Sequence, residues 1–133
     1  MFLFRRIVRR KVKIIKRRIK RPSKDYLLKK ELSRELVHQR LEHFNQFYKF
    51  KYNRVFIKNM KTRWGSCSSK KNLNFHYKII DLAPDLADYL VVHELCHIGE
   101  FNHSTNFWSL VEKTMPDYKN QRIELKKTDL KSL

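Results

Sequence analysis

The chain has 133 residues, of which 41% are hydrophobic, and it contains 2 Trp, 6 Tyr and 9 Phe. This composition excludes wholesale disorder, and the length suits one folded domain. No apolar run approaches the roughly 20 residues of a membrane span, and the N-terminus lacks the apolar segment of a secretory signal. Two cysteines cannot build a disulfide framework, so we expect a reducing, cytoplasmic setting.

Most of the net charge of +18 lies near the N-terminus. Residues 1–24 carry 12 Lys and Arg and no acid, whereas the rest of the chain carries 19 basic and 13 acidic residues. We therefore expect a basic N-terminal arm over residues 1–22 and a folded domain over residues 23–133. The arm could bind nucleic acid or another polyanion, or it could be a solvated segment that favours solubility.

A long helix is predicted after the break at Pro22 and Ser23. Ser23 is a suitable N-cap, and the helical pattern continues to about Tyr48. Apolar residues recur along it at helical spacing and predict one core-facing stripe, made of Leu28, Leu32, Val37, Leu41, Phe44 and Tyr48. His38 and His43 lie on this helix without metal-ligand spacing, which indicates surface or packing residues.

Two strands are predicted next, over residues 54–59 and 73–77. The polar cluster at 69–72 is typical of a turn. Together these segments predict a short antiparallel sheet that includes a hairpin. An extended substrate could add to a free edge of such a sheet through main-chain hydrogen bonds.

The stretch VVHELCHIGEFNH, residues 91–103, contains the H-E-x-x-H pattern. Its apolar flanks predict a buried helix that begins at Pro84 and ends between residues 98 and 101. Residues four apart on a helix are offset by only about 40° around its axis, so His93 and His97 project side by side. Glu94 lies next to this pair, where it can act as a general base toward a water molecule.

A third histidine follows the pair at a spacing that suits a metal ligand. Gly99 and Asn102 favour a bend after the helix, which would bring His103 back toward the pair. Three protein ligands with an open fourth position are typical of catalytic zinc, whereas structural zinc usually has four protein ligands. We therefore predict a Zn²⁺ site at His93, His97 and His103.

Two shorter helices complete the expected α+β fold. Ser104 is a suitable N-cap for the first, whose predicted packing face consists of Phe107, Trp108, Val111 and Met115. Pro116 ends this helix, and a last helix is predicted over residues 117–127.

Several segments resemble, in the same order, the YgjP-like metal-dependent hydrolases of the zincin clan, which are related to SprT-type proteases. They are KTRWGSCS at 61–68, LAP at 82–84, YLVVHELCH at 89–97, NHS at 102–104, FW at 107–108 and PDY at 116–118. The resemblance covers about residues 25–127 and implies a small zincin-like domain. It implies His93, His97 and His103 as zinc ligands and Glu94 as the general base. Longer members carry a β-rich region before the first helix, where this chain has about 22 basic residues.

Three functions fit these observations. The first is a zinc metallopeptidase acting on peptides or proteins. The second is a nucleoside triphosphate pyrophosphohydrolase acting on UTP, which the family resemblance also implies. The third is a nucleic-acid-binding zinc protein without enzymatic activity, although the intact Glu94 argues against a purely structural metal site.

Other side chains could contribute to hydrolysis by stabilising a transition-state oxyanion. Candidates by residue type are Arg63, His76, Tyr118 and Arg122. For Tyr118 and Arg122, packing and surface charge are the favoured interpretations. Core or packing roles are favoured for Trp64, Trp108, Cys67 and Cys96.

Overall fold

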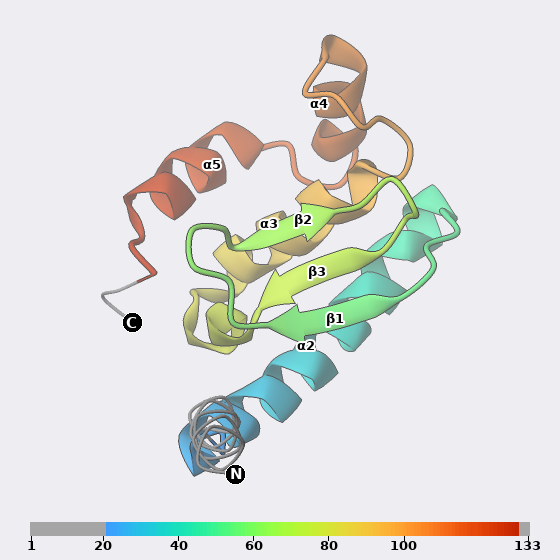
Figure 1. The fold of residues 1–133 in the computed structure, drawn as a ribbon. Coiled ribbons are helices and arrows are strands. Elements are labelled where there is room, and N and C mark those ends of the chain that lie inside the picture. Colours follow the sequence, from blue (N-terminus) through green and yellow to red (C-terminus); the bar gives the residue numbers. More distant parts are fainter. Residues whose placement is uncertain (1–20, 131–133) are drawn as a thin grey trace, which may run out of the picture.

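The computed structural model describes residues 21–130, so the predictions for arm residues 1–20 lie outside it. The described chain is a small α+β domain, as predicted, with four α-helices and a three-stranded sheet (Figure 1). In chain order the elements are α2 (Lys24–Tyr48), β1 (Val55–Lys58), β2 (Gly65–Cys67), β3 (Leu73–His76), the 3₁₀ helix η1 (Tyr77–Asp81), α3 (Pro84–Cys96), α4 (Thr105–Glu112) and α5 (Tyr118–Lys127). None of the helices within residues 21–130 has the length and apolarity needed to cross a membrane.

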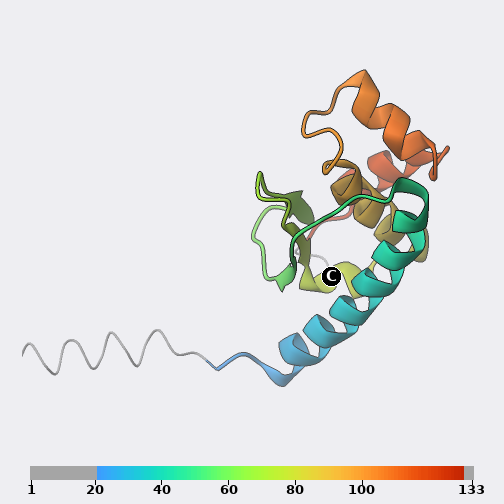
Figure 2. The same ribbon diagram turned by 90° about the vertical axis from the view of Figure 1, so that its right-hand side faces the viewer.

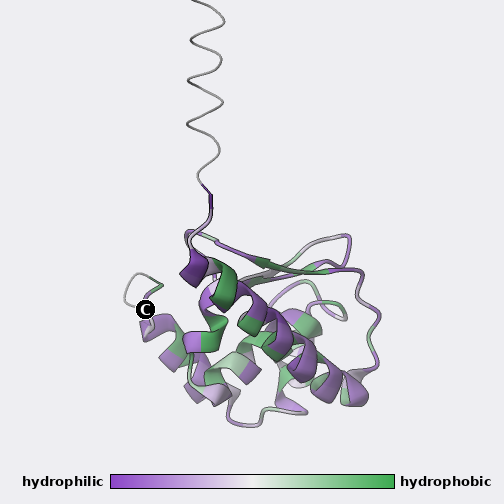
Figure 3. Ribbon diagram, turned by 90° about the horizontal axis from the view of Figure 1, so that it is seen from below, coloured by the Kyte–Doolittle hydropathy of each residue, from purple (hydrophilic) through white to green (hydrophobic). Residues whose placement is uncertain are grey.

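Helix α2 begins and ends as predicted. The Ser23 hydroxyl accepts a hydrogen bond from the backbone N–H of Tyr26, which caps the first turn. The apolar stripe is only partly confirmed, because Leu28 and Leu32 are 61% and 42% exposed. The face that packs inward instead runs through Ser33, Val37, Leu41 and Phe44. The first turns of α2 extend below the sheet in Figure 1, and hydrophobic and hydrophilic residues alternate along the helix in Figure 3.

The sheet is mixed rather than antiparallel, which corrects the sequence-based prediction. The two predicted strands, β1 and β3, pair in parallel, and the antiparallel hairpin is formed by β3 with β2, a strand that was not predicted, in the order β1-β3-β2. The segment between β1 and β2 therefore crosses from one edge of the sheet to the other. As a result β2 is an edge strand, and it contacts α3, which carries the histidine pair.

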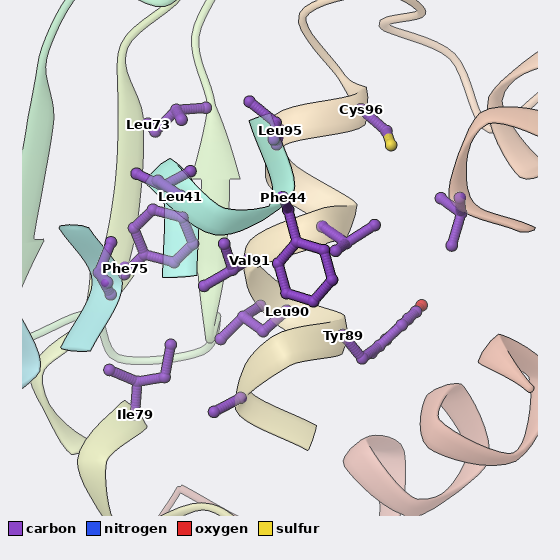
Figure 4. Packing of buried hydrophobic residues seen from close by; sticks show 14 of the residues in the cluster. Leu41, Phe44, Leu73, Phe75, Ile79, Tyr89, Leu90, Val91, Leu95 and Cys96 are labelled. Carbon is purple, nitrogen blue, oxygen red and sulfur yellow. The ribbon is translucent and has the colours of Figure 1, made fainter. Parts of the chain in front are cut away.

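Helix α3 lies at the centre of the domain and contacts α2, α4, α5, β2 and β3. Figure 2 shows the sheet on one side of the domain and α2 on the other. Figure 4 shows the core between them, where Leu90, Val91 and Leu95 of α3 face Leu73 and Phe75 of β3. Because these side chains are almost fully buried, α3 is held firmly at this position.

A polar contact also fixes α3 against α2. The guanidinium of Arg40 donates two hydrogen bonds to the carboxylate of Asp88, with its Nη2 lying 2.7 Å from Oδ2. Such a two-pronged contact between charged groups is stronger and more directional than a neutral hydrogen bond. It restrains α3 one turn before the histidine pair.

The chain after α3 returns to cover one side of it. Ser104 caps α4 through a hydrogen bond from the backbone N–H of Phe107, and Phe107 and Val111 of α4 are buried. Helix α5 packs against α3 without burying any residue completely. The segment after α5 is tied to the sheet side of the domain, because the Trp64 indole N–H donates to the carbonyl of Thr128 over 3.4 Å.

Candidate metal centre and active-site cleft

The three predicted histidines meet at one point. The Nε2 atoms of His93, His97 and His103 lie 3.1 to 3.2 Å from one another. Tetrahedral coordination with bonds of about 2.0–2.1 Å would separate neighbouring ligand nitrogens by roughly 3.3 Å. The three imidazoles could therefore hold a single divalent metal ion.

The chain reaches this arrangement by leaving the helix earlier than predicted. Helix α3 ends at Cys96, and His97 occupies its C-cap with helical backbone angles. Gly99 does not adopt a positive φ, contrary to its expected role in the bend. It provides space instead, because a Cβ there would lie 2.8 Å from the Phe50 ring and 3.1 Å from a methyl group of Leu110.

Two partners orient the helical histidines from the far side of their rings. The Nδ1 atom of His97 lies 3.0 Å from the carbonyl oxygen of Glu100, and Nδ1 of His93 lies 3.2 Å from the hydroxyl of Tyr89. The carbonyl can only accept, so His97 carries its proton on Nδ1 and presents the Nε2 lone pair to the centre. Burial, followed by the neighbouring His97 and His103, lowers the pKa of His93 to about 3, so this imidazole is also neutral.

Tyr89 was not identified from the sequence. It lies four residues before His93, one turn earlier on the same helical face, which is the signal that could have revealed it. The side chain is 2% exposed and points away from the sheet (Figure 4). Burial raises the pKa of its hydroxyl to about 12, so the group stays protonated and can hold the His93 ring in place.

We expect Tyr89→Phe to weaken metal binding by about 10- to 100-fold, the usual effect of losing a hydrogen-bond partner of a histidine ligand. Titration of the metal against a competing chelator measures this change. The matched control is Tyr48→Phe, because the Tyr48 hydroxyl bonds to the Leu110 carbonyl and Thr114, away from the three histidines. Equal affinity in wild type and Tyr89→Phe would contradict the orienting role.

Phe107 supports all three imidazoles at once. Its fully buried ring stacks on His97 with a centroid distance of 4.4 Å and meets His93 and His103 edge-on at 5.0 and 5.1 Å. His103 also stacks on Trp108, with a distance of 5.8 Å between the ring centroids. Helix α4 thus fixes the exposed third histidine through aromatic contacts.

Glu94 is almost completely buried beside the histidines, with 4% of its surface exposed. Its Oε2 atom has no hydrogen-bond partner among the described residues. Burial raises the pKa of Glu94 to about 8, and the nearby Arg63 acts in the opposite direction. A buried carboxylate without a partner is costly, and a cation with its bound water would remove that cost.

Gly65, the first residue of β2, allows the strand to approach this carboxylate. A Cβ at Gly65 would lie 2.9 Å from Oε1 of Glu94 and 3.1 Å from the carbonyl oxygen of Asn74. The second contact is with backbone, which cannot move aside easily. Position 65 therefore needs glycine for space, and the Trp64-Gly65 pair brings the edge strand directly over Glu94.

The centre opens into a cleft with two adjoining pockets. The strand-side pocket is lined by Arg63, Gly65, Ser66, Cys67, His93, Glu94, His97, Phe101 and His103. The helix-side pocket has a volume of about 330 Å³ and is lined by Arg63, Trp64, Gly65, Tyr89, Leu90, His93, Glu94, His103, Trp108, Arg122, Leu125 and Lys126. Glu94 and two of the histidines line both, so the centre lies where the pockets meet.

The other candidates from the sequence fall into two groups. Arg63 and Arg122 line the cleft, although a surface role was favoured for Arg122. Tyr118 stacks on Trp108 and lines neither of the two pockets. His76 also lies outside the pockets, and its Nδ1 accepts the backbone N–H of Lys78 as the cap of η1.

The aromatic and thiol candidates differ in position. Trp64 and Trp108 are partly buried and form walls of the helix-side pocket rather than core alone. Both cysteines are free thiols. Cys96 is a packing residue in the core, as predicted, whereas Cys67 is half-buried and lines the strand-side pocket.

Comparisons with known proteins identify the family of the chain. The chain is similar to two solved metallopeptidase zymogens. Abylysin of Pyrococcus abyssi has a TM-score of 0.60 and 26% identity, and the match covers 68% of this chain and 93% of that chain. Jannalysin of Methanocaldococcus jannaschii has a TM-score of 0.54 and 28% identity, and the match covers 71% of this chain and 91% of that chain. The search of curated proteins finds no match. The model of the YgjP-like metallopeptidase domain matches residues 5–128, and the chain therefore belongs to the YgjP-like metallopeptidase family.

Proposed function

We propose that this protein is a zinc-dependent peptidase that hydrolyses peptide bonds in extended polypeptides. In this proposal His93, His97 and His103 hold the metal ion and Glu94 is the general base. The observation that carries the proposal is the convergence of the three Nε2 atoms beside a buried carboxylate, in a cleft bordered by an edge strand. Three imidazoles at tetrahedral spacing suit Zn²⁺.

The protein's own groups divide the work of hydrolysis between them. A zinc ion bound there would polarise the scissile carbonyl and make a water molecule more acidic. Glu94 accepts the proton of that water and returns it to the leaving amine. Arg63 lines both pockets and is the candidate best situated to donate hydrogen bonds to the developing oxyanion.

The edge strand β2 supports an extended substrate. Within residues 21–130 it pairs only with β3, so its outer edge retains unpaired main-chain groups beside the centre. A peptide added along this edge would form main-chain hydrogen bonds and cross the three histidines. Such binding requires no particular side chain, which suits a polypeptide substrate.

A nucleoside triphosphate pyrophosphohydrolase is the second candidate. The observation that favours it is the presence of three cationic side chains around the helix-side pocket, Arg63, Arg122 and Lys126. The non-enzymatic alternative receives less support, because a structural metal site has no use for a buried carboxylate at the open side. Nucleic-acid binding by the basic arm remains a prediction.

The test offers both substrates to the same zinc-loaded protein. We expect it to cleave an unfolded, fluorescently labelled protein into fragments detectable by mass spectrometry, and we expect excess chelator to stop the cleavage by removing the metal. UTP is the parallel substrate, with UMP and pyrophosphate as its products. If UMP and pyrophosphate are released but no peptide fragments appear, the pyrophosphohydrolase would replace the peptidase as the proposed function. If neither the labelled protein nor UTP yields a product, a binding protein without enzymatic activity would be favoured.

A further inference from the structure

The helix-side pocket combines an apolar floor with a cationic rim. Tyr89, Leu90 and Leu125 contribute to its interior. Arg63 enters from the segment before β2, whereas Arg122 and Lys126 enter from α5, where they are four residues apart and so share one face. Glu94 is the one acidic residue that lines it. A substrate group held there would have an apolar stem and an anionic end.

None of the three rim cations forms an ion pair among residues 21–130. The one acid of the pocket, Glu94, is buried, which raises its pKa to about 8, and Arg63 acts on that pKa in the opposite direction. The ion pairs among the described residues join Lys29 to Asp81, Arg34 to Glu31, Arg40 to Asp88 and Lys127 to Glu124. Arg63, Arg122 and Lys126 take part in none of them. The nearby acid of α5, Glu124, is paired with Lys127, so the pocket keeps its positive charge.

One of these cations is also held in a defined orientation. The guanidinium of Arg122 lies 4.7 Å from the centre of the Trp108 ring, a cation–π contact. Trp108 also stacks with His103 and with Tyr118, at centroid distances of 5.8 and 5.1 Å. These contacts connect Arg122, through Trp108, to the proposed metal ligand His103.

We propose that the helix-side pocket selects a substrate residue that presents a carboxylate beside the scissile bond. This inference rests on the proposed peptidase function. The carboxylate could belong to a Glu or Asp side chain or to the free C-terminus of the peptide, since both offer two oxygens to an arginine fork. The apolar floor would hold the aliphatic stem of such a residue, which a triphosphate chain lacks.

The test uses peptides that differ at one residue next to the cleaved bond. Glu, Gln and Lys versions are each prepared with a free and an amidated C-terminus, and kcat/KM is measured with zinc-loaded enzyme. We expect Glu to exceed Gln by about two- to fivefold, the upper part of the range of a partly exposed ion pair, and Lys to be the poorest. If the Glu preference persists in peptides with an amidated C-terminus, the pocket binds the side-chain carboxylate. If amidation abolishes cleavage, the pocket binds the C-terminal carboxylate of the peptide.

Paired variants identify the residues responsible. Arg122→Gln with Lys126→Gln should remove the preference. The control, Lys113→Gln with Lys119→Gln, removes the same charge at exposed positions that do not line the pocket and form none of these ion pairs, and it should keep the preference. Cleavage of Glu, Gln and Lys peptides at equal rates, with either C-terminus, would overturn the proposal while leaving the peptidase function intact.

A binding measurement separates the two proposals. The affinity of the Glu and Gln peptides for metal-free protein can be followed through the fluorescence of Trp64 and Trp108, which line the pocket. Tighter binding of the Glu peptide, reduced in the Arg122 and Lys126 variant, supports the carboxylate pocket even if no peptide is cleaved. Binding of UTP without any binding of the Glu peptide would overturn it.

Discussion

Replacing Glu94 by glutamine is expected to abolish peptide hydrolysis while leaving metal binding intact. Glutamine has nearly the same shape, so the 4% exposed site can accommodate it, but its amide cannot accept a proton at neutral pH. Losing a general base reduces the rate by about 10²- to 10⁴-fold. Turnover of a labelled peptide and the zinc content of the purified variant measure the two properties separately.

The control for this substitution is Glu124→Gln. Glu124 is exposed on α5 and pairs with Lys127, so its loss changes charge without touching the cleft. We expect wild-type turnover from it. Wild-type turnover in Glu94→Gln would remove Glu94 from the mechanism, and loss of zinc in that variant would mean that Glu94 acts on the metal site itself.

Replacing His97 by alanine is expected to remove the stabilisation that zinc gives to the folded protein. Metal that binds only the folded state stabilises it by about 2.7 kcal/mol when its concentration is 100 times the Kd, which raises the Tm of a domain of this size by roughly 10 °C. With one of three ligands gone, this rise should disappear. Thermal unfolding with and without zinc measures it for each variant against its own metal-free state.

Two further variants make this result specific. His103→Ala should also abolish the zinc-dependent rise, and because His103 is exposed it should leave the metal-free Tm almost unchanged. His38→Ala removes an exposed histidine of α2 and should keep the full rise. A zinc-dependent rise of normal size in His97→Ala would exclude this residue as a ligand.

The features that could be predicted from the sequence are those within one helix or its caps. The 93–97 spacing determines that His93 and His97 lie side by side, because both belong to one helical face. Ser23 and Ser104 mark the starts of α2 and α4, because a side-chain oxygen there satisfies a free backbone N–H. The four-residue spacing that places His93 beside His97 would also have identified Tyr89 as a partner of His93.

The tertiary structure alone decided which distant segments meet. It pairs β1 in parallel with β3, so that β2 becomes the free edge beside the centre. It also brings Gly65 against Glu94 and carries Arg122 of α5 to the same cleft. These contacts depend on how whole elements pack, and periodicity within one segment carries no record of that packing. The clustering of the three histidines could therefore be predicted from the sequence, whereas the cleft that would select a substrate appears only in the folded chain.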